Sequence, residues 1–243
     1  MSALKRLIVN ADGLGSSTSF DEAVEEASRG GILRSASLRM DTPRTRSAVA
    51  QVQGLPGVGL GLHVVLCGGK PFAPVAEVPS LVDSLGRFPD DVEALSGADG
   101  AHVLAEVRAQ LRSFRELTGR LPTHLDTHAD AHRVPLVHEA LITLAWELGL
   151  PVRALTAAQR QRMVEEGLPV PDHFLDGNDI AASGLDGLVE RLVGLELGTT
   201  ELRCPLPLGR DSFDAHWLAH REVRQAVQAA GVHVDSFEPL VAA

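Results

Sequence analysis

The sequence contains no tyrosine, few other aromatic residues and only two cysteines. Phenylalanine and tryptophan together make up 4% of the 243 residues, which leaves few flat surfaces on which the rings of a polysaccharide could stack. We therefore expect a small substrate rather than a polymer. Cys67 and Cys204 lie too far apart in the sequence for a metal-binding motif, and we interpret them as reduced, buried apolar residues.

Basic residues and long apolar runs are also scarce. Lys and Arg number 22 against 32 Asp and Glu, so the net charge is −10 and no polybasic segment occurs. This balance argues against a nucleic-acid or anionic-membrane partner. No stretch reaches the roughly 18 apolar residues of a membrane helix, and the first ten residues, MSALKRLIVN, lack the apolar core of a signal peptide. We expect a cytoplasmic protein.

Short apolar runs alternate with longer amphipathic runs along the chain, and 44% of residues are hydrophobic. This alternation predicts parallel strands joined by helices in one α/β domain over residues 1–243. The expected strands are 6–12, 35–40, 58–66, 124–128, 151–155, 200–206 and 232–237. The expected helices are 21–32, 101–120, 135–149 and 214–231, with loops at 67–100 and 156–184. About seven such units favour a (β/α) barrel over an open sheet, and a homo-oligomer is left open.

Polar residues occur where several of these strands end. Asn10 and Asp12 lie at the end of the first strand, and His63 lies in the third. The segment THLDTHADAH (123–132) contains the fourth strand and the residues after it, with His124, Asp126, His128, Asp130 and His132 at even positions. Because alternate residues of a strand share a face, several of these side chains can point the same way. Histidine and carboxylate groups are common ligands of Zn²⁺ and of harder divalent cations. The pattern predicts a cleft at the C-terminal ends of the strands.

Each residue also has a simpler explanation. A single histidine such as His63 in a strand is usually a packed core residue, and three histidines at regular spacing can line an exposed helix face. Asp12 could be a helix N-cap near Ser16 and Ser17. The coincidence of polar side chains at three strand ends favours the cleft.

Five segments together resemble the YdjC/ChbG family of carbohydrate deacetylases. They are VNADGLG, DEAVEEASRGGILRSASL, GLGLHVVL, PTHLDTHADAH and PVRAL, in the family's order and spacing. The resemblance covers nearly the whole chain. It implies a distorted TIM-like (β/α) barrel, related to the polysaccharide deacetylases, with a divalent metal at the strand ends and hydrolysis of an N-acetyl group.

The resemblance also implies roles for particular residues. Asp12 would be the catalytic base and Arg153 would orient Asp12 or the substrate. His63 and His128 would hold the metal, Mg or Zn. The supporting or substrate-binding positions that match the family motifs, one of them with a changed residue, are Asn10, His124, Asp126, Asp130 and His132.

Three positions depart from the family's pattern. Gly13 stands where the family has a metal-binding Asp, and Asp130 stands where it has a His. The late Cys-His-Pro motif, whose His is the general acid, reads Cys204-Pro205 here. We expect the metal to be bound more weakly than in the family, or lost, with Asp130 as a candidate replacement ligand.

Three functions are compatible with this sequence. The first is a hydrolase that removes an N-acyl group from a small sugar-like substrate. The second is a tailoring enzyme that uses the cleft for metal-free acid/base chemistry, such as elimination, isomerisation or cyclisation. The third is a non-catalytic sugar-binding protein. Metal content separates the first function from the other two.

Overall fold

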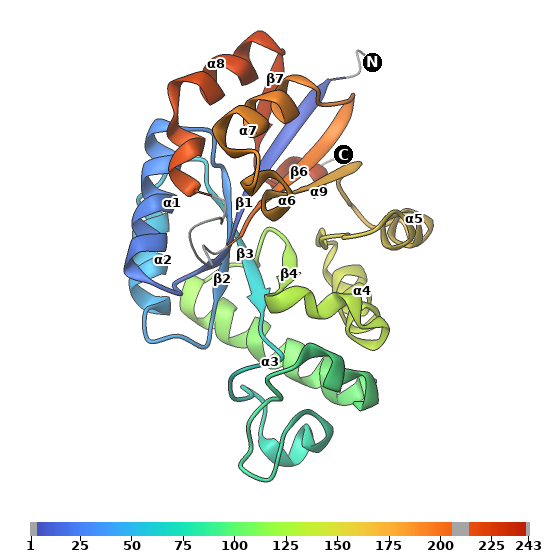
Figure 1. The fold of residues 1–243 in the computed structure, drawn as a ribbon. Helices are drawn as coiled ribbons and strands as arrows, with labels where there is room; N and C mark the ends of the chain where they lie inside the picture. The colour runs from blue at the N-terminus through green and yellow to red at the C-terminus, as the bar shows by residue number, and fades with distance from the viewer. Residues whose placement is uncertain (1–3, 206–213, 242–243) are drawn as a thin grey trace.

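The computed structural model describes residues 4–205 and 214–241, and its centre is a curled sheet of seven parallel strands (Figure 1). The strands are β1 (Lys5–Leu14), β2 (Ser35–Arg39), β3 (Gly59–Val64), β4 (Leu125–Thr127), β5 (His173–Asp176), β6 (Gly198–Cys204) and β7 (Val232–Asp235). Their order is β4-β3-β2-β1-β6-β5. Strands β6 and β7 pair with opposite edges of the first half of β1, and β2 continues along the β7 edge of its second half.

Helices surround the sheet on its outer side (Figure 1). The α-helices are α1 (Thr18–Gly30), α2 (Thr45–Gln53), α3 (Gly100–Thr118), α4 (Pro135–Leu148), α5 (Ala157–Glu165), α6 (Gly177–Ala181), α7 (Gly184–Val193), α8 (Arg221–Ala229) and α9 (Glu238–Val241). Short 3-10 turns are η1 (Val75–Glu77), η2 (Pro79–Leu81), η3 (Val92–Gly97), η4 (His128–Arg133) and η5 (Ala215–Ala219). Within the described ranges, each helix is too short or too polar to cross a membrane.

The sheet is buried on both faces, which explains its apolar strands. Every residue of β3 is buried, and so is β1 from Leu7 onward. Parallel strands of this kind place all their C-terminal ends at one rim. The predicted α/β barrel is thus confirmed in its distorted form: among the described residues, no strand pairing joins β4 to β5, so the sheet remains open there.

Helix α3 shows how the sequence sets one of these elements. Val103, Val107 and Phe114 form an apolar stripe, and all three are fully buried. The Asp99 side chain accepts a hydrogen bond from the backbone N–H of Ala101 at 2.8 Å, which caps the first turn. Gly119 ends the helix with a φ of 73°, a conformation that glycine adopts without strain. The helix expected at 101–120 is confirmed.

The region 156–184, expected to be a loop, contains regular structure instead. Helix α5, strand β5 and helix α6 all lie in it. Helix α5 buries only Met163, and every residue of β5 is half-exposed, so neither has a strong apolar pattern. The strand expected at 151–155 is reduced to a single bridge, in which Val152 pairs with Leu125 of β4.

The helix expected at 214–231 is divided in two. Turn η5 and helix α8 meet at His220, whose extended backbone interrupts the helix and whose side chain caps α8. Helix α2 was not expected. The strand expected at 200–206 ends at Cys204, and residue 206 lies outside the described residues.

A histidine fills the interior of the sheet below its C-terminal rim. His124 is fully buried and stacks on Phe237 with ring centroids 3.9 Å apart. Its ring lies against Gly61, where an added Cβ would come within 2.2 Å of His124 Cε1. Gly61 precedes His63 by two residues on the same face of β3, so His124 lies one layer below the rim.

We expect Gly61→Ala to destabilise the protein by about 1–3 kcal/mol, because the new methyl group must displace a packed imidazole. Urea unfolding measures this difference. Gly97→Ala is the matched control, since nothing lies within 4 Å of a Cβ at that position. Equal stability of the two variants would show that His124 is not held against β3.

Candidate active site

A cavity of about 360 Å³ opens at the C-terminal ends of the strands. Its lining residues are Asp12, His63, Thr127, His128, Ala129, Asp130, Asn178, Arg203 and Pro205. Asp12, His63 and His128 come from three separate segments, and the sequence predicts that their side chains lie together in one cleft. The parallel arrangement of the strands explains why these side chains line one cavity, because β1, β3 and β4 all end at this rim.

Arg153 lies at the centre of the charged groups beneath the cavity. Its Nη1 donates to Asp12 Oδ2 at 2.5 Å and its Nη2 to Asp12 Oδ1 at 2.7 Å, a bidentate ion pair. Nε donates to Glu201 Oε1 at 2.7 Å, and Nη1 lies 3.3 Å from Asp126 Oδ2. Arg153 is fully buried. A guanidinium held in this way fixes the carboxylate of Asp12 in one orientation.

Glu201 was not predicted as a site residue. It lies on β6, where Glu201 and Arg203 alternate with the apolar Leu202. Two charged residues on the same face of an otherwise buried strand indicate an inward-facing polar site, and that signal was present in the sequence.

Three carboxyl groups surround the single guanidinium of Arg153, so they cannot all ionise without cost. Burial raises the pKa of Glu201 to about 7; Arg153 opposes this shift, and Asp12 and Asp126 add to it. Burial likewise raises the pKa of Asp12, against the pull of Arg153. Burial opposes ionisation of Asp126 too, but His63 and Arg153 hold its pKa well below the ordinary range.

Hydroxyl and amide groups complete the network. The Asn10 Nδ2 donates to Asp12 Oδ1 at 2.9 Å, and the Ser35 hydroxyl donates to Asn10 Oδ1 at 2.7 Å. The Ser37 hydroxyl donates to Asp126 Oδ2 at 2.7 Å. Asn10 therefore has the supporting place that the sequence indicated, and the two serines of β2 were not predicted.

His63 is oriented by Asp126. Its Nδ1 lies 2.8 Å from Asp126 Oδ1, which leaves Nε2 as the nitrogen available to the cavity. The ring of His128 meets that of His63 edge-on, with centroids 5.6 Å apart. Burial, with Arg39 nearby, lowers the pKa of His128 to about 4. The His128 imidazole is therefore suited to bind as a neutral ligand, and the contact with Asp126 fixes the orientation of the His63 ring.

These groups fit a divalent cation. Asp12, His63 and Asp126 each offer a ligand atom, and the three atoms lie within 4.8 Å of one another. The carboxylates outnumber the guanidinium, so a cation would offset a buried excess of negative charge. Nitrogen and carboxylate donors together suit Zn²⁺ or a harder divalent ion.

Gly13 contributes no ligand to this cluster. It lies at an irregularity of β1, where the register against β2 shifts between Asp12 and Leu14. Its φ is 84°, in the region that favours glycine. The chain therefore has a local backbone reason for glycine at the position where the resemblance leads one to expect a metal-binding Asp.

Asp130 lines the cavity but belongs to a different group of charges. Its Oδ1 accepts from Arg203 Nη1 at 2.5 Å, and it is not among the three clustered donors. Burial opposes its ionisation, but Arg203 lowers the pKa of Asp130 below the ordinary value. The hypothesis that Asp130 replaces the missing ligand is not supported by this arrangement.

Two of the predicted residues lie away from the cavity. His124 is in the layer below it, as described above. His132 lies in η4, where its Nδ1 is 2.6 Å from the Thr127 hydroxyl, and it lines a separate hollow beside α4. The even spacing of 123–132 fails as a guide beyond Thr127, because β4 ends there and the chain turns.

The position of the family's late histidine is occupied by Pro205, which lines the cavity. The preceding Cys204 is fully buried, and burial raises the pKa of its thiol. Leu206 and Pro207 lie outside the described residues. Neither Cys204 nor Pro205 can serve as a general acid at neutral pH.

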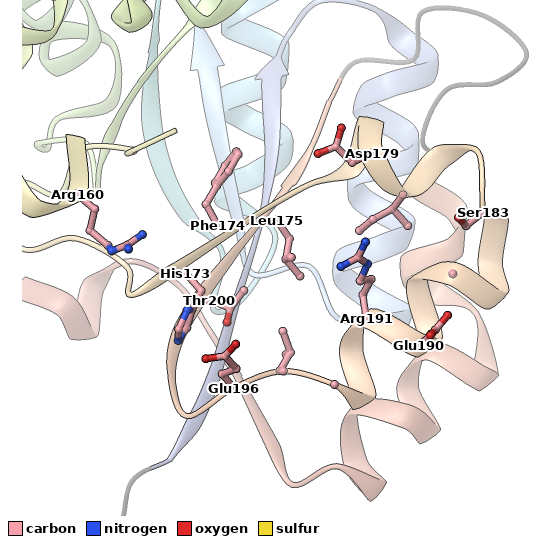
Figure 2. A pocket seen from close by; sticks show the side chains of 14 residues that line it. Arg160, His173, Phe174, Leu175, Asp179, Ser183, Glu190, Arg191, Glu196 and Thr200 are labelled. Atoms are coloured by element: carbon pink, nitrogen blue, oxygen red, sulfur yellow. The ribbon is translucent and has the colours of Figure 1, made fainter. Parts of the chain in front are cut away.

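A larger groove of about 770 Å³ lies between β5, β6 and helices α5, α6 and α7 (Figure 2). Arg160, His173 and Arg191 line it, together with Thr200. Thr200 precedes Glu201 on β6 and therefore faces the opposite side of the sheet from Arg153. None of the residues predicted for the site lines this groove.

The raised pKa of Glu201 predicts a dependence of stability on pH. The folded protein holds this proton up to about pH 7, whereas an unfolded glutamate releases it near its ordinary value of 4.5. Stability should therefore fall as pH rises through this interval. Glu201→Gln removes the titration, so its free energy of unfolding should fall less than that of the unaltered protein between about pH 5 and about pH 8.

Urea unfolding at several pH values gives this comparison. Glu139→Gln, on the exposed face of α4, is the control and should follow the unaltered protein. Parallel profiles for Glu201→Gln and the unaltered protein would contradict the raised pKa.

Relatives and solved structures agree with this architecture. A carbohydrate deacetylase of Geobacillus stearothermophilus is 36% identical over 170 residues, which cover 70% of this chain and 68% of the relative. An Enterococcus faecalis protein whose name proposes cleavage of cellobiose phosphate has a TM-score of 0.86 at 24% identity, with 98% and 99% of the two chains covered. A peptidoglycan N-acetylglucosamine deacetylase shares the fold more distantly, with a TM-score of 0.53 at 10% identity and 97% and 87% coverage.

The family model described as YdjC-like protein matches residues 6–233. That range contains every strand of the sheet except the first residue of β1 and the last two residues of β7, and all the residues that line the cavity. The chain belongs to the YdjC-like protein family.

Proposed function

We propose that this protein is a hydrolase that removes the acetyl group from the nitrogen of a small amino sugar. The observation that carries the proposal is the bidentate pair between Arg153 and Asp12 at the base of the cavity. The name of the Geobacillus relative, carbohydrate deacetylase, supports the substrate class. We further propose that the enzyme acts in the cytoplasm on sugars of few rings.

Asp12 is the proton acceptor in this proposal. Burial raises its pKa above the ordinary value, which makes the carboxylate a stronger base than an exposed aspartate. Arg153 and Asn10 hold both of its oxygens in place, while the side chain still lines the cavity. Such fixed geometry brings the base to a water molecule that attacks the amide carbon.

His63 and His128 would hold a divalent metal. His128 is outside the group of three clustered donors, and Asp126, which belongs to that group, would orient His63 rather than bind the metal. The metal, when bound, would supply Lewis acidity toward the amide carbonyl and lower the pKa of water. Because Nδ1 of His63 faces the Asp126 carboxylate, Nε2 is the ring nitrogen that would bind the metal.

The leaving amine also needs a proton. With proline at position 205, we propose that Asp12 returns the proton it accepted, since it lines the same cavity as the reacting amide. One carboxylate would then act first as base and afterwards as acid.

Acid/base chemistry without a metal is the second candidate function. It is favoured by Gly13 and Pro205, which replace two of the family's catalytic side chains. The Asp12–Arg153 and His63–Asp126 pairs would be sufficient for proton transfer in an elimination or isomerisation.

Asp12→Asn should reduce turnover by at least about 100-fold, because the amide cannot accept a proton. The fold should persist, since Arg153 keeps Glu201 and Asp126 as partners. Amine release from an N-acetylated disaccharide measures activity, and circular dichroism measures the thermal midpoint.

Asp21→Asn is the matched control. Asp21 is also a buried aspartate paired with an arginine, Arg44 at 2.9 Å, but it does not line the cavity. It should lose stability and keep turnover. Full turnover by Asp12→Asn would remove Asp12 from the chemistry.

Gly13→Asp should raise the affinity for a divalent metal by about tenfold or more, because each anionic ligand added to a site strengthens binding. The φ of 84° will cost of order 1–3 kcal/mol in the metal-free protein. Calorimetric titration with Zn²⁺ measures the affinity.

Gly57→Asp is the control, since Gly57 has a similar φ of 75° and nothing within 4 Å of a Cβ. It should carry the strain without the gain in affinity. If Gly13→Asp binds metal no more tightly than the unaltered protein, another carboxylate of the cluster already fills that place.

A further inference from the structure

One part of the cavity lining, called the wall below, consists of Asp130, Asn178 and Arg203. These residues come from three segments: η4, the start of α6 and the end of β6. None of them belongs to the charged cluster around Arg153. The wall lies beside the proposed reacting groups, so a substrate held at Asp12 would contact it.

Arg203 is held rigidly within this wall. Its Nη1 donates to Asp130 Oδ1 at 2.5 Å, and its Nε donates to Asp176 Oδ1 at 3.1 Å while Nη2 pairs with Asp176 Oδ2. The guanidinium also lies 5.8 Å from the ring centroid of Phe174. Burial opposes the charge, but Asp176 and Asp130 raise the pKa of Arg203 above its ordinary value.

Within the described part of the chain, the Asp130–Arg203 pair has donors and an acceptor that make no hydrogen bond. A guanidinium has five N–H donors, and three of those on Arg203 are used for Asp130 and Asp176. Within residues 4–205 and 214–241, Asp130 accepts a hydrogen bond through Oδ1, and Oδ2 has no donor there. Donors and an acceptor at fixed positions suit neighbouring hydroxyl groups on a sugar ring, each of which both donates and accepts.

The backbone at this point is strained. Ala129 and Asp130 have φ values of 51° and 54°, in the left-handed region that residues other than glycine seldom adopt. Two such residues in succession, on the rim of a cavity, are typical of a segment held for function. The turn carries the Asp130 carboxylate to Arg203.

The charges of the wall do not balance. Among the described residues, Asp130 and Asp176, which pairs with Arg203 but does not line the cavity, contribute two negative charges against one positive charge on Arg203. Asp12, on the adjacent part of the cavity, is paired with Arg153. A ligand with a phosphate or carboxylate group would therefore meet net repulsion here. A neutral sugar, or one with an ammonium group, would not.

We propose that the Asp130–Arg203 pair determines substrate specificity, by binding sugar hydroxyl groups and rejecting sugars that carry an anionic group. This inference rests on the proposed function for its substrate class. It also accounts for the acidic residue at position 130, which the metal cluster does not use.

Asp130→Asn tests the proposal, because it removes one negative charge with little change in shape. Asparagine tolerates a positive φ as well as aspartate does, so the turn should persist. The measurement is the ratio of kcat/KM for N-acetylglucosamine disaccharide to kcat/KM for N-acetylglucosamine 6-phosphate. We expect this ratio to fall by about tenfold or more in the variant, as repulsion of the phosphate weakens.

Glu139→Gln is the control for net charge, because it removes one negative charge from an exposed pair outside the cavity. It should leave the ratio unchanged. A ratio that changes less than about twofold in Asp130→Asn, or equally in Glu139→Gln, would overturn the proposal.

A binding measurement tests this inference independently of the proposed deacetylase activity. Saturation-transfer NMR with the same two sugars is carried out on the unaltered protein and on Asp130→Asn. Preference for the neutral sugar, reduced in the variant, supports the inference even if no acetyl group is released. Equal binding of both sugars by the unaltered protein overturns it, whether or not the protein deacetylates either one.

Discussion

The buried guanidinium of Arg153 is the interaction on which the arrangement of the cavity depends. It joins carboxylates from β1, β4 and β6, so three strands that are distant in the sequence share one charged centre. A buried charge of this kind is stable only while its partners are in place. The guanidinium fixes the orientation of Asp12 and, with His63, favours the ionised state of Asp126, whereas it opposes the burial that raises the pKa of Glu201. The proposed chemistry is therefore inseparable from the packing of the sheet.

Much of this arrangement was predictable from the sequence. Asp12 and His63 lie near the C-terminal ends of buried strands and His128 directly follows one, and parallel strands end at a common rim. Glu201 was missed because its strand was interpreted as an apolar run, although Glu201 and Arg203 alternate along it. Strand β5 was missed because its four half-exposed residues have no clear period. The regularly spaced histidines of 123–132 do not lie together in the structure. Strand β4 ends at Thr127, and beyond it alternate residues no longer share a face.

The departures from the family pattern have different structural settings. Gly13 has a backbone conformation that favours glycine, and Pro205 lines the cavity with a side chain that cannot donate or accept a proton. Asp130 gains a new partner in Arg203, which ties the segment after β4 to the end of β6. The first two changes reduce the catalytic groups, whereas the third adds a fixed polar pair. In the proposed function, the cavity would therefore offer fewer groups to the reacting amide and more to the rest of the substrate.

The open edge between β4 and β5 has a consequence for the size of the cavity. At this seam, as far as the structure describes the chain, the edge of β4 pairs through its backbone only with Val152. Side chains link this side of the sheet to β6, through Arg153 to Glu201 and through Asp130 to Arg203. Backbone hydrogen bonds hold paired strands about 4.8 Å apart. Where side chains link the two sides instead, the distance between the sides depends on the length of those side chains. A longer acid at position 130 would widen the aperture with every strand pairing retained. The width of the barrel at this seam therefore depends on the length of a few side chains, and a single substitution can change it.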